Sequence, residues 1–281
     1  MATLIQTLQN ILASKDPLLA PETRRIIMKE VLQAYVLDYL YNHLSYRHLN
    51  FYGGTCLHVV YGLNRLSEDL DFDNRAGLDL DPLADDLVQY FHKSLGDADV
   101  SAKAQEGEGG ILRVTIKFPV LNALGLSPHP SEALHLKVEV SRHEQVAVIQ
   151  RTPVLVYGRS LVAAHFSLET MMAGKMLACL ERNFERGRSG TQIKGRDFYD
   201  LLWFMQQHIQ PLEEKLARDG QQPYTVDSAM LALQEKIAHI KTRDLAIDLL
   251  PMFESRQFIE AWLEAFHENF QAWVKGYLGE K

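Results

Sequence analysis

The stretch that decides the fold is Asn50–Asp73, which reads NFYGGTCLHVVYGLNRLSEDLDFD. Its start, together with the preceding Leu49, predicts a short strand over Leu49–Tyr52, and after two glycines Cys56–Tyr61 predicts a helix. Glycine lets the backbone approach a ligand closely, and the N–H groups at a helix start attract anions. Because a Gly-Gly pair is also typical of an ordinary turn, this half of the stretch leaves both interpretations open.

The second half of the stretch places acidic residues at alternate positions. On a strand, Asp69 and Asp71 share one face, while Leu70 and Phe72 enter the core. Adjacent carboxylates repel each other unless a cation lies between them, and Mg²⁺ takes one or two carboxylates together with substrate phosphates. We therefore predict a site for Mg²⁺ or Mn²⁺ here, with Asp73 as its weakest member. A solvated acidic edge strand is the alternative.

A third carboxylate, Glu139, lies on the polar side of another predicted strand. Residues 134–141 alternate between apolar and polar side chains, as do residues 111–118. If the strand of Glu139 neighbours that of Asp69 and Asp71, three carboxylates converge. They can then hold two metal ions about 3.5–4 Å apart for displacement at phosphorus. An exposed strand carboxylate without a ligand is the other interpretation of Glu139.

The rest of the chain has a helical start, a mixed centre and a helical end. Pro21 suits the first turn of a helix, and Ser167 can cap another. We expect two domains: residues 1–165, with N-terminal helices and the sheet, and residues 166–281, helical and contributing to the active site. Further helices are predicted near residues 82–95, 167–183, 196–208, 226–240, 243–250 and 255–275.

Composition narrows the class of protein. The chain has 281 residues, of which 47% are hydrophobic and 23% charged, and this excludes a mainly disordered chain. We expect no membrane segment and no signal peptide, and with only Cys56 and Cys179 we expect reduced thiols in a cytoplasmic protein. The net charge of -7 disfavours non-specific coating of nucleic acid but permits a local basic path.

These residues resemble the nucleotidyltransferase AbiEii/AbiGii toxin family, within the DNA polymerase β-like nucleotidyltransferase superfamily. The likeness rests on Gly-Gly-Thr, a helix-bearing spacer, and Arg-x-Ser-x-Asp-x-Asp at Arg65–Asp71. It extends over about residues 25–205. Three later segments share it: LKVEVS at 136–141, ETMMAGK at 169–175 and GRDFYDLL at 195–202.

The resemblance implies an α+β fold with a small mixed nucleotidyltransferase-type sheet, flanking helices and a helical C-terminal part. It implies a metal-dependent nucleotidyltransferase toxin of a toxin–antitoxin system, with an antitoxin as partner. Such an enzyme binds an NTP and Mg²⁺ and transfers NMP to an acceptor hydroxyl, the tRNA 3′ end in characterised relatives. Two alternatives stay open: a nucleotide-binding module without transfer, and transfer to a small-molecule or protein hydroxyl.

Carried over residue by residue, Asp69 and Asp71 are the metal ligands, and Lys175 and Asp197 complete the site. The phosphates are held by Gly53, Gly54 and Thr55. Lys175 is a point charge suited to the β/γ-phosphates, although a solvated helix lysine is an equal interpretation. The general base is either Glu139 or Asp197.

Four further groups have candidate roles. Asp197 and Asp200 share one helix face at spacing i, i+3, although helix-start acids also stabilise the helix dipole. Arg65 pairs with a phosphate or with Asp69, and the hydroxyl of Ser67 can contact nucleotide. A basic strip beside the site can guide an RNA acceptor, or be a solvated loop. Its members are Arg182, Arg186, Arg188, Lys194 and Arg196.

Overall fold

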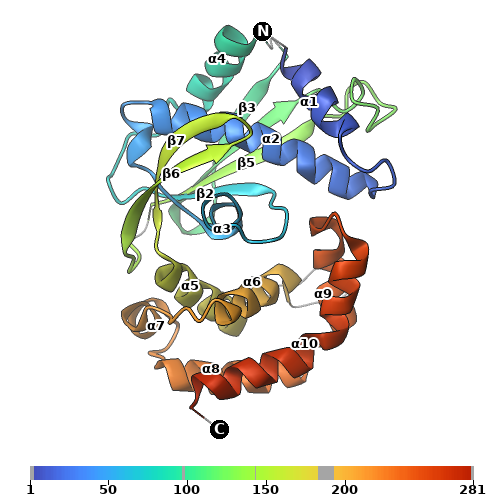
Figure 1. Ribbon diagram of the computed structural model, residues 1–281. Helices are drawn as coiled ribbons and strands as arrows, with labels where there is room; N and C mark the ends of the chain where they lie inside the picture. Colours follow the sequence, from blue (N-terminus) through green and yellow to red (C-terminus); the bar gives the residue numbers. More distant parts are fainter. Residues whose placement is uncertain (1–2, 97–98, 143, 183–192, 280–281) are drawn as a thin grey trace. The chain divides into compact units, whose positions relative to one another are not determined.

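The computed structural model consists of two compact units (Figure 1). The first comprises residues 1–144 and 149–165, and the second comprises residues 145–148 and 166–281. The described residues are 3–96, 99–142, 144–182 and 193–279.

The first unit is built on a seven-stranded mixed sheet with strand order β3-β4-β5-β2-β1-β7-β6. Its strands are β1 (Asn50–Tyr52), β2 (Asp69–Asp73), β3 (Ser101–Glu106), β4 (Ile111–Phe118), β5 (Leu134–Ser141), β6 (Ile149–Val156) and β7 (Arg159–Phe166). β2 runs parallel to β5 and antiparallel to β1, while β4 runs antiparallel to both β3 and β5. The mixed sheet with flanking helices confirms the predicted fold class.

Helices cover the apolar face of this sheet. They include α1 (Leu4–Ala13), α2 (Pro21–Asn42), α3 (Gly53–Tyr61) and α4 (Leu83–Leu95), with short 3-10 turns at Tyr46–His48 and Glu108–Gly110. Phe91 of α4 meets Phe118 of β4 with ring centroids 4.8 Å apart, and Tyr41 of α2 meets Phe72 of β2 at 6.4 Å. Alternate residues of β4 and β5 are buried on this side, so their other face keeps the polar side chains.

The second unit is helical. It contains α5 (Leu168–Glu181), α6 (Gly195–Gln206), α7 (Glu213–Asp219), α8 (Val226–Ala238), α9 (Thr242–Leu249), a 3-10 turn (Leu250–Met252) and α10 (Arg256–Tyr277). The Ser167 hydroxyl caps α5, as predicted, by accepting from the Thr170 N–H at 3.3 Å. A Cβ at Gly195 would lie 2.5 Å from the carbonyl oxygen of Leu245, so α6 starts directly against the backbone of α9.

Several elements differ from the sequence prediction. The helix α3 begins at Gly53 rather than at Cys56, so both glycines lie in its first turn. The predictions did not include β3, β6, β7 or α7. The strand β3 has the sequence SAKAQE and is largely exposed, so it lacks the apolar alternation from which strands are recognised.

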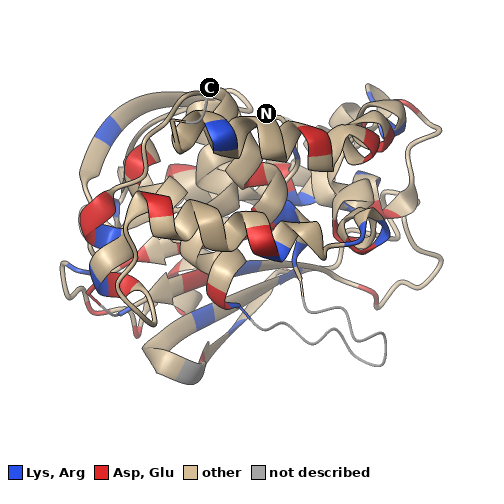
Figure 2. Ribbon diagram, turned by 90° about the horizontal axis from the view of Figure 1, so that it is seen from below, with Lys and Arg blue, Asp and Glu red and all other residues tan. Residues whose placement is uncertain are grey.

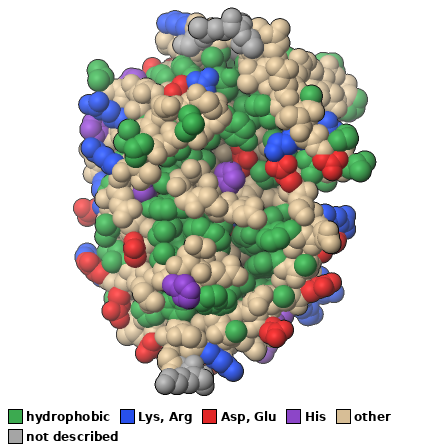
Figure 3. All heavy atoms as spheres, in the orientation of Figure 1, with side chains coloured by type: hydrophobic (Ala, Val, Ile, Leu, Met, Phe, Trp, Pro, Cys, Tyr) green, Lys and Arg blue, Asp and Glu red, His purple; other side chains and the backbone are tan. Residues whose placement is uncertain are grey.

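Charged and apolar side chains are mixed over the surface. Acidic and basic residues are scattered over helices and strands (Figure 2), and hydrophobic side chains reach the visible face among them (Figure 3). No helix among the described residues is long and apolar enough to cross a membrane. Cys56 and Cys179 are buried and free, as expected, and burial raises the pKa of both thiols.

Candidate active site

The two glycines of the first turn of α3 lie against predicted site residues. Gly53 has a φ of 79°, and a Cβ there would lie 2.2 Å from Oδ2 of Asp71. A Cβ at Gly54 would lie 2.5 Å from Nη2 of Arg65 and 3.1 Å from Oγ of Ser67. A carboxylate and a guanidinium therefore both reach the start of α3, because no side chain occupies the space.

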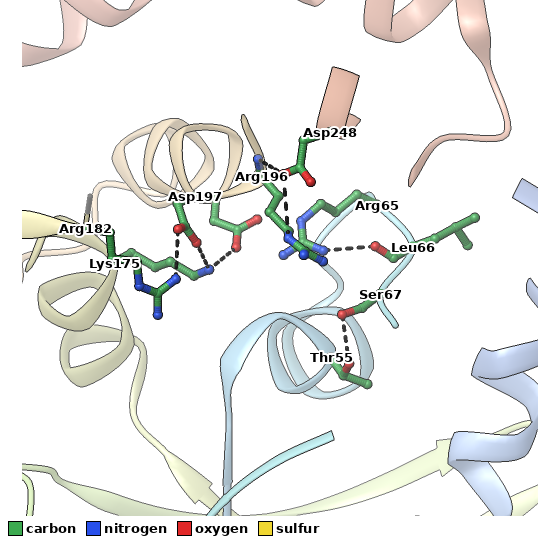
Figure 4. Close-up of polar contacts among 10 residues, drawn as sticks. Thr55, Arg65, Leu66, Ser67, Lys175, Arg182, Arg196, Asp197 and Asp248 are labelled. Carbon is green, nitrogen blue, oxygen red and sulfur yellow. Dashed lines mark hydrogen bonds and ion pairs between the residues drawn. The ribbon is translucent and has the colours of Figure 1, made fainter. Parts of the chain in front are cut away.

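Thr55 and Ser67 join α3 to the start of β2. The Thr55 hydroxyl lies 2.8 Å from Oγ of Ser67, a contact drawn in Figure 4, and 2.5 Å from the carbonyl oxygen of Asp69. Thr55 is fully buried and Ser67 is 5% exposed. Both hydroxyls thus form hydrogen bonds inside the protein. Contact between Thr55 and a phosphate would therefore use the backbone N–H of Thr55.

Asp69 and Asp71 are half-buried on β2, while Leu70 and Phe72 between them are fully buried, as the alternation predicted. Asp71 lies opposite Tyr52 of β1, whose next residue is Gly53. The strand pairing therefore sets the acidic face of β2 beside the glycine turn.

Asp73 has a different environment from the other two aspartates. It is fully buried, accepts from Nδ2 of Asn50 at 3.2 Å and pairs with Nε of Arg75 at 2.8 Å. These contacts tie the end of β2 to β1 and to the following loop. We therefore assign Asp73 to the fold and not to ligand binding.

Glu139 is the register neighbour of Asp71, because β5 pairs directly with β2. On its other side Glu139 faces Arg113 of β4, whose Nε lies 2.6 Å from Oε1 of Glu139. Among the residues that the structure describes, no group of three or more His, Cys, Asp and Glu side chains could hold a metal ion. Asp69 and Asp71 still fit Mg²⁺, which can complete its ligands with substrate phosphates.

Three polar residues of α2 support the segment before β2, and sequence reasoning did not identify them. Glu30 accepts from the Ser67 N–H at 3.0 Å, and Nε2 of Gln33 donates to the Ser67 carbonyl at 3.1 Å. Lys29 pairs with Glu68 at 2.8 Å. Glu30 and Gln33 are buried among the apolar residues of α2, and polar residues at positions of its apolar face are the signal that could have indicated them.

In the second unit, Lys175 of α5 binds two carboxylates of α6. Its Nζ lies 2.7 Å from Asp197 and 2.8 Å from Asp200, and Nη1 of Arg182 lies 3.0 Å from Asp197 (Figure 4). Asp197 and Asp200 thus share one helix face, as their spacing predicted. Burial alone would raise the pKa of Asp197, but the charges of Lys175 and Arg182 outweigh it and hold this pKa well below its usual range.

The described arginines of the predicted basic strip are both paired. Arg182 binds Asp197, and Arg196 reaches Asp248 through its backbone N–H at 3.1 Å and its Nε at 3.6 Å. Burial, followed by the charges of Arg196 and Arg182, lowers the pKa of Lys194. Arg186 and Arg188 lie outside the described residues.

The mixed sheet and its paired aspartates beside a glycine turn are the arrangement expected of a nucleotidyltransferase, and a solved structure shares the fold. A crystal structure from H. pylori, described as that of a nucleotidyltransferase, has a TM-score of 0.55 and 18% sequence identity, covering 91% of this chain and 97% of that chain. A nucleotidyltransferase-like antigenic protein from Paracoccidioides brasiliensis has a TM-score of 0.36 and 20% identity, covering 86% and 92%. No curated protein matches this chain.

The family follows from the sequence match. The model of the nucleotidyl transferase AbiEii toxin family, type IV toxin–antitoxin system, matches residues 36–281. The chain belongs to this family, which confirms the predicted resemblance. It is a nucleotidyltransferase, and its family implies an NTP substrate and an antitoxin partner.

Proposed function

We propose that this enzyme transfers NMP from an NTP to the 3′-terminal hydroxyl of a tRNA. The observation that carries the proposal is the contact between the two motifs: Asp69 and Asp71 lie on β2, directly beside the open first turn of α3. Carboxylates that hold a divalent cation and a helix start that attracts phosphate are the two elements this chemistry requires. The tRNA acceptor is the part of the proposal that rests on the family resemblance.

Binding of the NTP is assigned to the start of α3. The backbone N–H groups of Gly53, Gly54 and Thr55 have the position in a helix that favours an anion. Arg65 adds a guanidinium next to Gly54, where it is fixed by donating to the Leu66 carbonyl at 2.9 Å. A positive group at this point favours the phosphates over an uncharged ligand.

Asp69 and Asp71 would hold Mg²⁺ or Mn²⁺, which supplies charge neutralisation at the reacting phosphate when bound. In the transfer, the acceptor oxygen forms a bond to the α-phosphorus. The bond from this phosphorus to the bridging oxygen breaks, and pyrophosphate leaves with the electron pair. The proton of the acceptor hydroxyl passes to a base.

We assign the base to Glu139 in preference to Asp197. Glu139 neighbours Asp71 across the β2–β5 pairing. Asp197 is paired with two cations, Lys175 and Arg182, which hold its pKa well below the usual range and make it a poor proton acceptor, whereas Glu139 pairs with one cation, Arg113. For Lys175 the family resemblance implies binding of the β/γ-phosphates, and within the second unit Asp197 and Asp200 hold its ammonium group in place.

The test is transfer by isosteric variants. Asp69→Asn and Asp71→Asn keep the side-chain shape but remove the charge, so label transfer from each radioactive NTP to bulk tRNA with Mg²⁺ should fall on the order of 100-fold or more. Asp85→Asn, at an exposed position of α4, is the control and should keep full transfer. Undiminished labelling by both variants, with the wild type active, would refute the proposal.

A further inference from the structure

The strands β3, β4 and β5 carry lysines on the sheet face to which Asp69 and Asp71 belong. Lys103 of β3 lies opposite Thr115 of β4, Thr115 lies opposite Lys137 of β5, and Lys137 lies opposite Asp69 of β2. Lys117 is two residues beyond Thr115 and therefore points to the same side. These strands are neighbours in the sheet, in the order β3-β4-β5-β2. One continuous face thus runs from Asp69 to the sheet edge.

The part of this face that β3, β4 and β5 contribute has a surplus of positive charge. Lys103, Lys117 and Lys137 are exposed, and none of them forms an ion pair with a carboxylate of the residues that the structure describes. The charge of Arg113 on the same face is balanced by Glu139. A local positive surface therefore exists on a chain whose net charge is -7.

His135 lies on the same face, close to these lysines. It lies opposite Lys117 across the β4–β5 pairing. Its pKa is lowered first by partial burial and then by the charges of Lys117, Lys29 and Lys137. Burial contributes most to the lowered pKa of the imidazole, and the nearby lysines lower it further.

Protection of the sheet edge does not account for the pattern. Lysine on an edge strand discourages pairing with another chain, and this explains Lys103 on β3. Lys117 and Lys137, however, lie on strands that are paired on both sides. Their charge contributes nothing to edge protection, so a ligand is the better explanation.

The spacing of the lysines selects the ligand class. Strands lie about 4.8 Å apart and alternate residues about 6.8 Å apart, so the three positions spread over roughly 8–10 Å. An extended phosphodiester chain presents negative charge over such a distance and beyond. We propose that the exposed face of β3, β4 and β5 binds the phosphate backbone of an RNA whose 3′ end is directed towards Asp69 and Asp71. This rests on the proposed function.

The experiment compares two triple variants of the full chain. In the test variant, Lys103, Lys117 and Lys137 are each replaced by Gln. In the control variant, the exposed lysines Lys93, Lys241 and Lys275 are replaced by Gln, which removes the same charge elsewhere. The Kd for fluorescently labelled bulk tRNA is measured by anisotropy over a series of salt concentrations, and the KM for NTP is measured alongside.

We expect the test variant to bind tRNA at least about 10-fold more weakly than the wild type, with a salt dependence of log Kd reduced by about 2, because roughly 0.7 counterions are released per phosphate contact. The control variant should stay within about twofold of the wild type, and the KM for NTP should not change in either. An equal tRNA Kd and salt slope in the test variant and the wild type would overturn the inference. That result would also follow if the face binds an acidic protein.

The two proposals fail in different ways. If the wild type binds tRNA through these lysines but transfers no label, the proposed reaction is wrong and the binding face stands. If the wild type labels tRNA and the test variant binds and labels it equally well, the reaction stands and the binding face is wrong.

Discussion

A Cβ atom at Gly53 would lie 2.2 Å from Oδ2 of Asp71. The carboxylate in the middle of β2 therefore packs directly against the backbone of the first residue of α3. Gly53 and Asp71 are eighteen positions apart in sequence but form a single feature of the fold. Because of this contact, position 53 cannot accommodate a side chain. A side chain at this position would displace the Asp71 carboxylate, which we propose as a metal ligand.

The first prediction concerns this contact. Gly53→Ala should lower the free energy of unfolding by about 2–3 kcal/mol, because it combines a positive φ with an overlap onto Asp71, and should abolish transfer. Gly62→Ala is the matched control, since Gly62 has a φ of 75° but nothing within 4 Å. It should cost about 1 kcal/mol and keep activity. Urea unfolding and label transfer measure both, and equal effects would contradict the prediction.

The second prediction concerns the buried hydroxyl of Thr55. Thr55→Val keeps the shape but leaves the Ser67 hydroxyl and the Asp69 carbonyl without this partner, so we expect a loss of about 1–3 kcal/mol in unfolding free energy. Thr7→Val removes a solvent-exposed hydrogen bond of α1 and should stay within about 0.5 kcal/mol of the wild type. Indistinguishable urea midpoints for the two variants would show that the Thr55 contacts contribute nothing.

The third prediction concerns pH. The pKa of Asp197 is lower in the folded chain than the usual value of about 3.9, so its ion pairs stabilise the fold above that pH, and this stabilisation is lost as the pH falls towards the folded pKa. Asp197→Asn should be less stable by about 3 kcal/mol at pH 7. Below about pH 4 its unfolding free energy should fall less steeply than that of the wild type.

Urea unfolding from pH 7 to pH 2 measures this difference. The range is chosen because carboxylates with a lowered pKa lose their stabilising effect between about pH 5 and pH 1. Asp227→Asn, at an exposed position in the first turn of α8, is the control and should follow the wild-type profile. Parallel profiles for Asp197→Asn and the wild type would show that Lys175 and Arg182 do not stabilise the charged form of Asp197.

The fourth prediction concerns the start of α6. Gly195→Ala should destabilise the second unit by about 1–3 kcal/mol, because its Cβ would lie 2.5 Å from the Leu245 carbonyl oxygen and 2.9 Å from the Leu245 Cα. Gly276→Ala in the last turn of α10 meets nothing within 4 Å, and it should be neutral or raise stability by up to about 1 kcal/mol. Thermal unfolding distinguishes the two, and a Gly195→Ala protein as stable as the wild type would mean that α6 and α9 can separate without cost.

Much of the fold was predictable from local patterns. The alternation in β4 and β5 indicated both strands with their buried faces, and Ser167 indicated the start of α5. The hairpin strands β6 and β7 were not predicted as strands. In β6 the pattern is irregular, since Leu155 is 74% exposed and Pro153 interrupts the run.

For the candidate site, the sequence indicated residue types and spacing but not the contacts between them. The glycines and aspartates were identified from their types and spacing. That Thr55 binds inside the fold, that Arg113 pairs with Glu139, and that Lys175 binds two carboxylates follow from pairings between distant segments. No local pattern encodes such pairings.

The amino-acid order alone determined which side of each strand is apolar and where Asp69 and Asp71 project, because side-chain direction alternates along any extended chain. Tertiary structure decided which strands are neighbours. The β2–β5 pairing sets Glu139 beside Asp71 and continues the polar face to Lys137 and beyond. Register between distant strands depends on the packing of the whole sheet against α2 and α4, and for this reason only the folded chain shows it.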